Sequence, residues 1–161
     1  YTATGQYESA LYVLKSTGVA QVALDRTVRT AGQVHAFQGF MIALWASGND
    51  ELARELAEFS YNEPRTRMID WMPLIFTASE LSILGRDEQA VQSIELIKDS
   101  PRLPWNAFLR DAPTFSKYGT ERRYLETLQV IEDRKAALRQ RLTATLAEFG
   151  VALDPAQSPL K

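Results

Sequence analysis

The feature that most constrains the fold is a short phrase that occurs three times in this chain. It reads GQYESAL from Gly5, GNDELAR from Gly48 and GRDEQAV from Gly85, which is Gly-x-[Asp/Tyr]-Glu-x-Ala each time. Gly48 and Gly85 lie 37 residues apart, and each is followed 16 positions later by a proline, Pro64 or Pro101. Recurrence at a period of about 20 to 50 residues indicates a stack of similar structural units.

Each unit is expected to be a pair of helices, because apolar residues between the glycines recur at intervals of three and four. In the first full unit the apolar face runs from Val34 to Trp45, and the helix should end near Gly48. Asn49 or Asp50 then suits the cap of a second helix, which Pro64 ends. The glycine permits a positive φ at the joint, and the alanine of the phrase leaves room for a neighbouring helix.

No alternating strand pattern is visible, so the predicted fold class is all-α, an α–α superhelix of stacked antiparallel helix pairs with a long C-terminal helix. A truncated first unit should contribute a helix from about Gln6 to Thr17. Full units follow at 31–64 and 68–101, and together these make a repeat region of residues 1–101. Residues 19–30 are open between a helix, the start of a longer helix that runs into Ala31, and a loop.

The C-terminal part follows a different pattern. Residues 102–119 contain several prolines and are expected to be a linker with a helical turn around Trp105 to Leu109. Thr120 can cap a long helix, residues 120–150, that packs on the repeats, and residues 151–161 should be a loose tail. The helix carries an apolar seam that Lys135 interrupts: Leu125, Leu128, Ile131, Leu138, Leu142, Leu146 and Phe149.

The unit resembles a tetratricopeptide repeat, with Gly48 and Gly85 at the inter-helix turn, Ala53 and Ala90 early in the second helix, and prolines at its end. Departures are the longer unit and the absence of the family's usual tryptophan, since Phe37 and Leu74 stand there. The segment DAPTFSKYGTERRYLETLQ is similar to the ends of helical-repeat regions in bacterial signalling proteins. The resemblance implies a binding module, cut from a longer protein, with no bond chemistry.

Composition excludes several chemistries. The chain has no Cys and a single His, His35, which excludes disulfides, thiol nucleophiles and sites with two imidazoles. It has no Gly-rich phosphate loop, so no cofactor is expected. A net charge of −2 argues against a nucleic-acid surface. No apolar run is long enough to span a membrane, and the lack of Cys and of a visible targeting segment suits a cytoplasmic protein.

The carboxylate pairs Asp50–Glu51 and Asp87–Glu88 are interpreted as first-turn charges rather than as acid–base pairs. Ser79 and Ser82 lie beside Glu80, but such neighbours on a helix are common, and no catalytic, cofactor or metal residue is predicted. The basic stretch from Asp133 to Arg141 is read as a solvated helix face, with binding of an acidic partner or nucleic acid as the alternative.

The predicted binding surface is the concave groove that the first helices of the units would line. Trp45 is the preferred anchor, because aromatic residues dominate interface energetics; the alternative is that Trp45 packs against the neighbouring unit. We therefore expect a non-enzymatic protein or peptide interaction module that serves as a regulatory part of a larger bacterial signalling protein. A homo-oligomerisation or scaffold domain, a homodimer through the C-terminal helix, is the alternative. The residues expected in the groove are His35, Gln38, Ile42, Trp45, Met72, Ile75, Ser79 and Ser82.

Overall fold

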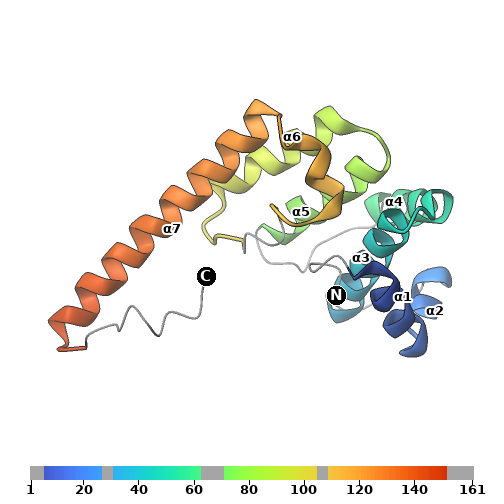
Figure 1. The fold of residues 1–161 in the computed structure, drawn as a ribbon, viewed down its shortest axis with the longest axis horizontal. Helices are drawn as coiled ribbons and strands as arrows, with labels where there is room; N and C mark the ends of the chain where they lie inside the picture. The colour runs from blue at the N-terminus through green and yellow to red at the C-terminus, as the bar shows by residue number, and fades with distance from the viewer. Residues whose placement is uncertain (1–5, 27–30, 63–70, 105–108, 152–161) are drawn as a thin grey trace.

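The computed structural model describes residues 6–26, 31–62, 71–104 and 109–151, and over these ranges it contains helices and turns but no strand. The prediction of an all-α chain is therefore confirmed for the described part. The helices pack mainly on their neighbours in sequence, from α1 at one end of the molecule to α7 at the other (Figure 1). The elements are α1 Tyr7–Ser16, α2 Val19–Leu24, α3 Ala31–Ala46, α4 Asp50–Asn62, α5 Met72–Ile83, α6 Asp87–Glu95, the 3-10 helices η2 Leu96–Asp99 and η4 Pro113–Tyr118, and α7 Arg122–Glu148.

The joints α3–α4 and α5–α6 have the same geometry, as the repeated phrase predicts. Gly48 and Gly85 adopt φ of 79° and 75°. The following amide closes each helix on the carbonyl five residues back, from Asn49 to Leu44 at 2.9 Å and from Arg86 to Leu81 at 2.8 Å. A Cβ on either glycine would meet no atom within 4 Å, so the positive φ alone accounts for glycine at these joints.

The expected side-chain cap is wrong at one joint. Arg86 stands at the N-cap of α6, its side chain makes no capping hydrogen bond, and Asp87 is already the first helical residue. The cap of α7 also differs from the expectation, because Glu121 rather than Thr120 accepts the amide of Arg123. At α6 the acidic Asp87 pairs with Lys117 of η4, whereas at α7 Glu121 pairs with Arg123 two residues ahead.

The small residues of the phrase lie at the closest helix contacts. Ala53 and Ala90 are fully buried, each in one of two apolar clusters. One cluster joins α1, α2, α3 and α4, and the other joins α5, α6, η2, η4 and α7. Ile83 from the second unit belongs to the first cluster, which links the units across their boundary.

The 37-residue register continues beyond the second unit. Arg86 pairs with Glu58 at 3.2 Å, and the residues 37 positions later, Arg123 and Glu95, pair at 3.6 Å. Thr127, which lies 37 residues after Ala90, is buried as well. The N-terminal half of α7 therefore presents Arg123 and Thr127 at positions that correspond to Arg86 and Ala90.

The stretch expected to be a linker contains η4, which packs into the body of the protein. Thr114 and Phe115 of η4 are fully buried, and η4 packs against both α3 and α5. The rings of Phe115, Tyr118 and Tyr124 then lead from η4 into α7, with centroid distances of 6.4 and 6.1 Å. The turn expected around residue 105 lies mostly outside the described residues, as do residues 27–30, 63–70 and the tail from 152.

The uncertain segment after α1 forms the short helix α2. Arg26 has a φ of 54°, which ends the helical conformation there, so one continuous helix from residue 19 into Ala31 does not form. α1 itself spans Tyr7–Ser16 and ends at Gly18 with a φ of 74°, as predicted from the sequence. Both short helices pack on α3.

We predict that Gly85→Ala lowers the free energy of unfolding by about 1 to 2 kcal/mol, because an L-residue at this positive φ is strained. Gly39→Ala is the matched control: Gly39 lies inside α3 with open space around its missing Cβ, and alanine there should stabilise the protein by about 0.5 to 1 kcal/mol. Urea denaturation followed by circular dichroism measures both. Equal effects at the two positions would contradict the role of the joint.

Candidate functional site

The residues predicted to line a groove divide into two groups. Gln38, Ile75, Ser79 and Ser82 are buried, so they do not present an open surface to a partner. His35, Ile42, Trp45 and Met72 are partly exposed. Even these make internal contacts: the His35 ring meets the Phe76 ring edge-on at 5.3 Å, and Ile42 and Trp45 pack against the first apolar cluster.

The buried group is covered partly by the chain's own η4. The hydroxyl of Ser82 donates to the carbonyl of Thr114 at 2.6 Å, and Lys117 Nζ donates to the carbonyl of Ser82 at 2.9 Å. A segment 30 or so residues downstream thus packs on the face that α3 and α5 were expected to leave open. The sequence offered one sign of this, the apolar pair Phe115 and Tyr118 within the proline-containing stretch.

A buried polar cluster joins three helices at the unit boundary. Gln38 of α3 donates its Nε2 to Glu80 Oε1 of α5 at 2.5 Å, and the same nitrogen lies 3.1 Å from Ser60 Oγ of α4. Gln38 is 2% exposed and Glu80 is fully buried. A buried carboxylate is costly unless it is hydrogen-bonded, so Gln38 serves the fold rather than an open binding surface.

We predict that Gln38→Met lowers the free energy of unfolding by about 1 to 3 kcal/mol, because it removes a hydrogen-bond donor from a buried carboxylate. Gln129→Met is the control, since Gln129 makes a comparable hydrogen bond to Asp133 on the exposed side of α7. That variant should change stability by less than about 0.5 kcal/mol. Urea denaturation measures the free energy of unfolding of both variants. A similar decrease in the two would contradict a special role of Gln38 in stability.

The carboxylates of the third phrase hold α7 and η4 against α6. Asp87 pairs with Lys117 at 2.5 Å and accepts the Tyr118 hydroxyl at 2.9 Å. Glu88 receives both terminal nitrogens of Arg123, at 2.6 and 3.0 Å. First-turn charge was the expected role of these residues, and their long-range partners were not foreseen. They connect segments about 30 to 35 residues apart, so they act in tertiary packing.

The electrostatics of the two carboxyls reflect these partners. Burial alone would raise the pKa of Asp87, but hydrogen bonds from Lys117 and Tyr118 and the lysine charge outweigh it and lower that pKa below 3.8. Hydrogen bonds from Arg123 and then Gln92 lower the pKa of Glu88 below 4.5. The pKa values of both carboxyls are lower in the folded protein than in the unfolded chain. Their contribution to stability is therefore fully present above the unfolded-chain pKa values, and it is lost as the pH falls through the pKa values of the folded protein.

We predict that Asp87→Asn destabilises the protein at pH 7 by no more than about 1 kcal/mol, since the pair with Lys117 is solvent-exposed. The difference from wild type should shrink as the pH falls below 3.8, where protonation removes the same charge from the wild-type protein. Urea midpoints at pH 7 and pH 3 measure this, with Asp133→Asn on the exposed side of α7 as the control. A difference that grows toward acid pH would contradict the assignment.

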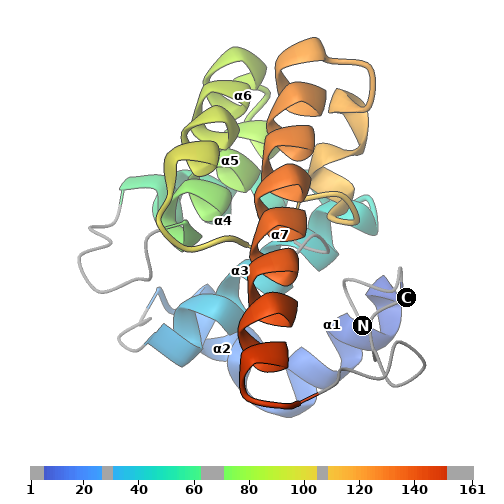
Figure 2. The same cartoon turned by 90° about the vertical axis from the view of Figure 1, so that its left-hand side faces the viewer.

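The C-terminal half of α7 extends beyond the other helices. The N-terminal half is anchored: Tyr124 donates to the carbonyl of Leu109 at 2.6 Å, Ile131 is buried, and Arg134 donates to the carbonyls of Lys98 and Ser100. The remaining turns run away from the body (Figure 1), and in Figure 2 this end of α7 lies in front of the other helices. We call residues 136–149 the arm.

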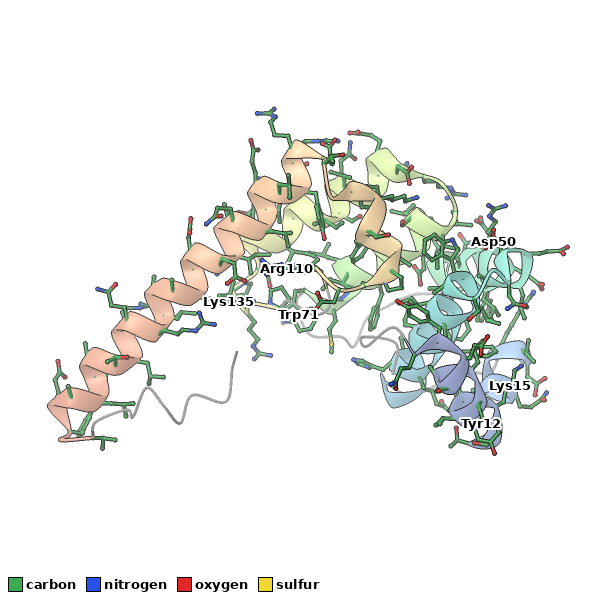
Figure 3. All side chains as sticks on the ribbon, viewed as in Figure 1. Tyr12, Lys15, Asp50, Trp71, Arg110 and Lys135 are labelled. Atoms are coloured by element: carbon green, nitrogen blue, oxygen red, sulfur yellow. The ribbon has the colours of Figure 1, made fainter. Side chains whose placement is uncertain are left out.

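The arm carries an exposed apolar row. Leu138, Leu142 and Phe149 are 46%, 54% and 78% exposed, respectively. Lys135, just before the arm, lies with Arg110 and Trp71 on the inner side of α7 (Figure 3), and burial lowers its pKa. The boundary between covered and uncovered helix therefore falls between Lys135 and Leu138. The sequence predicted this seam but not the point at which its packing stops.

The described part of the chain holds no group of three or more His, Asp or Glu side chains placed to bind a metal ion, and none of its helices is long and apolar enough to cross a membrane. Comparisons with known protein families, with curated proteins and with solved structures gave no match.

Proposed function

We propose that this chain is a non-enzymatic protein or peptide interaction module, and that it belongs to a larger bacterial signalling or regulatory protein. The observation that carries the proposal is the arm, where Leu138 and Leu142 stand exposed on α7 and Phe149 stands exposed at its C-cap. Exposed apolar rows that are bordered by polar residues are typical of protein-interaction sites. Recognition by such a surface needs no cofactor.

The helix pairs support a scaffold of the tetratricopeptide-like kind. The joints at Gly48 and Gly85 share the same hydrogen bonds and positive φ, and the pairing of Arg86 with Glu58 recurs 37 residues later. Stacked helix pairs of this kind serve mainly as rigid carriers of binding surfaces. Their rigidity here would fix the direction in which the arm projects.

The proposal places the main contact on the arm and a secondary one on the partly exposed residues of the expected groove. His35, Ile42, Trp45 and Met72 retain some accessible surface, while η4 packs over Ser82 beside them. A partner that reaches from the arm toward α3 would touch these side chains. The alternative function, homo-oligomerisation through α7, would use the same apolar row. The test below distinguishes self-association from binding of a partner.

We expect the double variant Leu138→Ser/Leu142→Ser to lose binding of amphipathic helical peptides by at least tenfold. Burial of one leucine side chain contributes roughly 1.5 to 3 kcal/mol, and about 1.4 kcal/mol corresponds to tenfold in affinity. The probes are three-heptad peptides with leucine at the seam positions and glutamate, glutamine or lysine beside them, and isothermal titration calorimetry measures their affinity.

The matched control is Leu24→Ser/Leu96→Ser, which changes two similarly exposed leucines on α2 and η2, away from the arm. This variant should bind like the wild type. If no peptide of the three sets binds the wild-type chain, the interaction function on the arm fails. Light scattering that shows a concentration-dependent dimer, abolished by the Leu138→Ser/Leu142→Ser pair, would favour the oligomerisation alternative instead.

A further inference from the structure

The exposed row of the arm continues the face by which α7 packs on its own protein. Tyr124, Leu128 and Ile131 contact the body, and Leu138, Leu142 and Phe149 follow at intervals of three, four or seven residues on the same side of the helix. The preceding units have no counterpart for this length: α4 is 13 residues long, whereas α7 is 27. The arm therefore extends an internal contact face beyond the stack.

The spacing of the exposed row indicates that a single helix of a partner would fit it. A narrower row of positions, called the docking seam below, follows alternating steps of three and four residues: Leu128, Ile131, Lys135, Leu138, Leu142, Thr145 and Phe149. A seam of alternating three and four is narrow and fits one facing helix, whose side chains enter the spaces between the seam residues. Lys135 is largely buried against the body, so the docking seam beyond it is apolar apart from Thr145.

The charges beside the docking seam identify the chemistry of that helix. Between Asp133 and Glu148 the chain has four basic residues and no acidic one. Arg134 and Lys135 are used internally, by the carbonyls of Lys98 and Ser100 and by Glu132. Arg139 and Arg141 lie on opposite flanks of the docking seam, are exposed, and form no ion pair within the part of the chain that the structure describes.

A second copy of the arm is a poor match for this surface. Two arms laid together bring Arg139 and Arg141 of each copy into one contact, with Glu148 as the single acidic residue of each arm. Like charges at such flanking positions oppose pairing, whereas glutamates there favour it. A lipid surface is less suited than a helix, because the docking seam is narrow and continues a face that already packs on protein.

We propose that the arm docks an acidic amphipathic helix of a partner protein, with leucine-like residues on the docking seam and carboxylates against Arg139 and Arg141. This inference rests on the proposed interaction function and adds the chemistry of the partner. The arginine flanks would set the choice and direction of the partner helix, while the leucines supply most of the contact. Binding should weaken with added salt, since exposed charges are screened.

The test uses the whole chain and the peptide set described above. The glutamate-flanked peptide should bind at least tenfold more tightly than the lysine-flanked one at low salt. The variant Arg139→Glu/Arg141→Glu should reverse that order. The control Arg54→Glu/Arg122→Glu changes the net charge equally at exposed positions away from the arm, and it should keep the wild-type preference.

The outcomes separate this inference from the function on which it rests. If the glutamine- or lysine-flanked peptide binds through Leu138 and Leu142 as tightly as the glutamate-flanked one, the acidic partner is wrong while the interaction function stands. If none of the peptides binds, the function itself fails. Self-association detected by light scattering would mean that a second copy of the chain covers the arm. Sedimentation with vesicles of anionic phospholipid, abolished by Arg139→Glu/Arg141→Glu, would mean that a membrane covers it.

Discussion

The left-handed backbone at the helix joints is the constraint on which the rest of this structure depends. At Gly48 and Gly85 the chain reverses within three residues, and the next helix returns along the previous one. Each reversal brings a small residue, Ala53 or Ala90, into full burial and thereby sets the separation of the helices. The pairing of Arg86 with Glu58 recurs 37 residues later between Arg123 and Glu95, although no left-handed glycine precedes α7.

Local features of the fold could be predicted from the sequence. The joints, the ends of α1 at Gly18 and of α7 at Gly150, and the buried alanines depend on residues close in the chain, and each adopts the expected conformation. Sequence periodicity carries such information because helix faces and turn conformations are local properties. At the α6 cap Asp87 pairs with the distant Lys117, which the local sequence does not reveal, whereas Glu121 of the α7 cap pairs with Arg123 two residues ahead.

The candidate site was harder to predict for the same reason. Periodicity indicates that one face of α5 is apolar and another is polar, but it does not say which segment covers the polar one. The packing of Pro113–Tyr118 on α3 and α5 hides Ser82, and the partnership of Gln38 with Glu80 removes two more polar residues from the surface. The apolar row of α7 was predicted from the sequence. Its exposure was not, because it depends on how far η2 and the other packed elements extend along the helix.

The contact between Gln38 and Glu80 has a consequence for how the molecule comes apart. Glu80 belongs to the second helix pair, yet its buried carboxylate depends on a donor from the first, and Ser60 of α4 stands at the same point. If the pairs separated, the hydrogen bond between Gln38 and this buried carboxyl would break. The two pairs should therefore open as one cooperative unit, with the uncovered end of α7 fraying well before either of them.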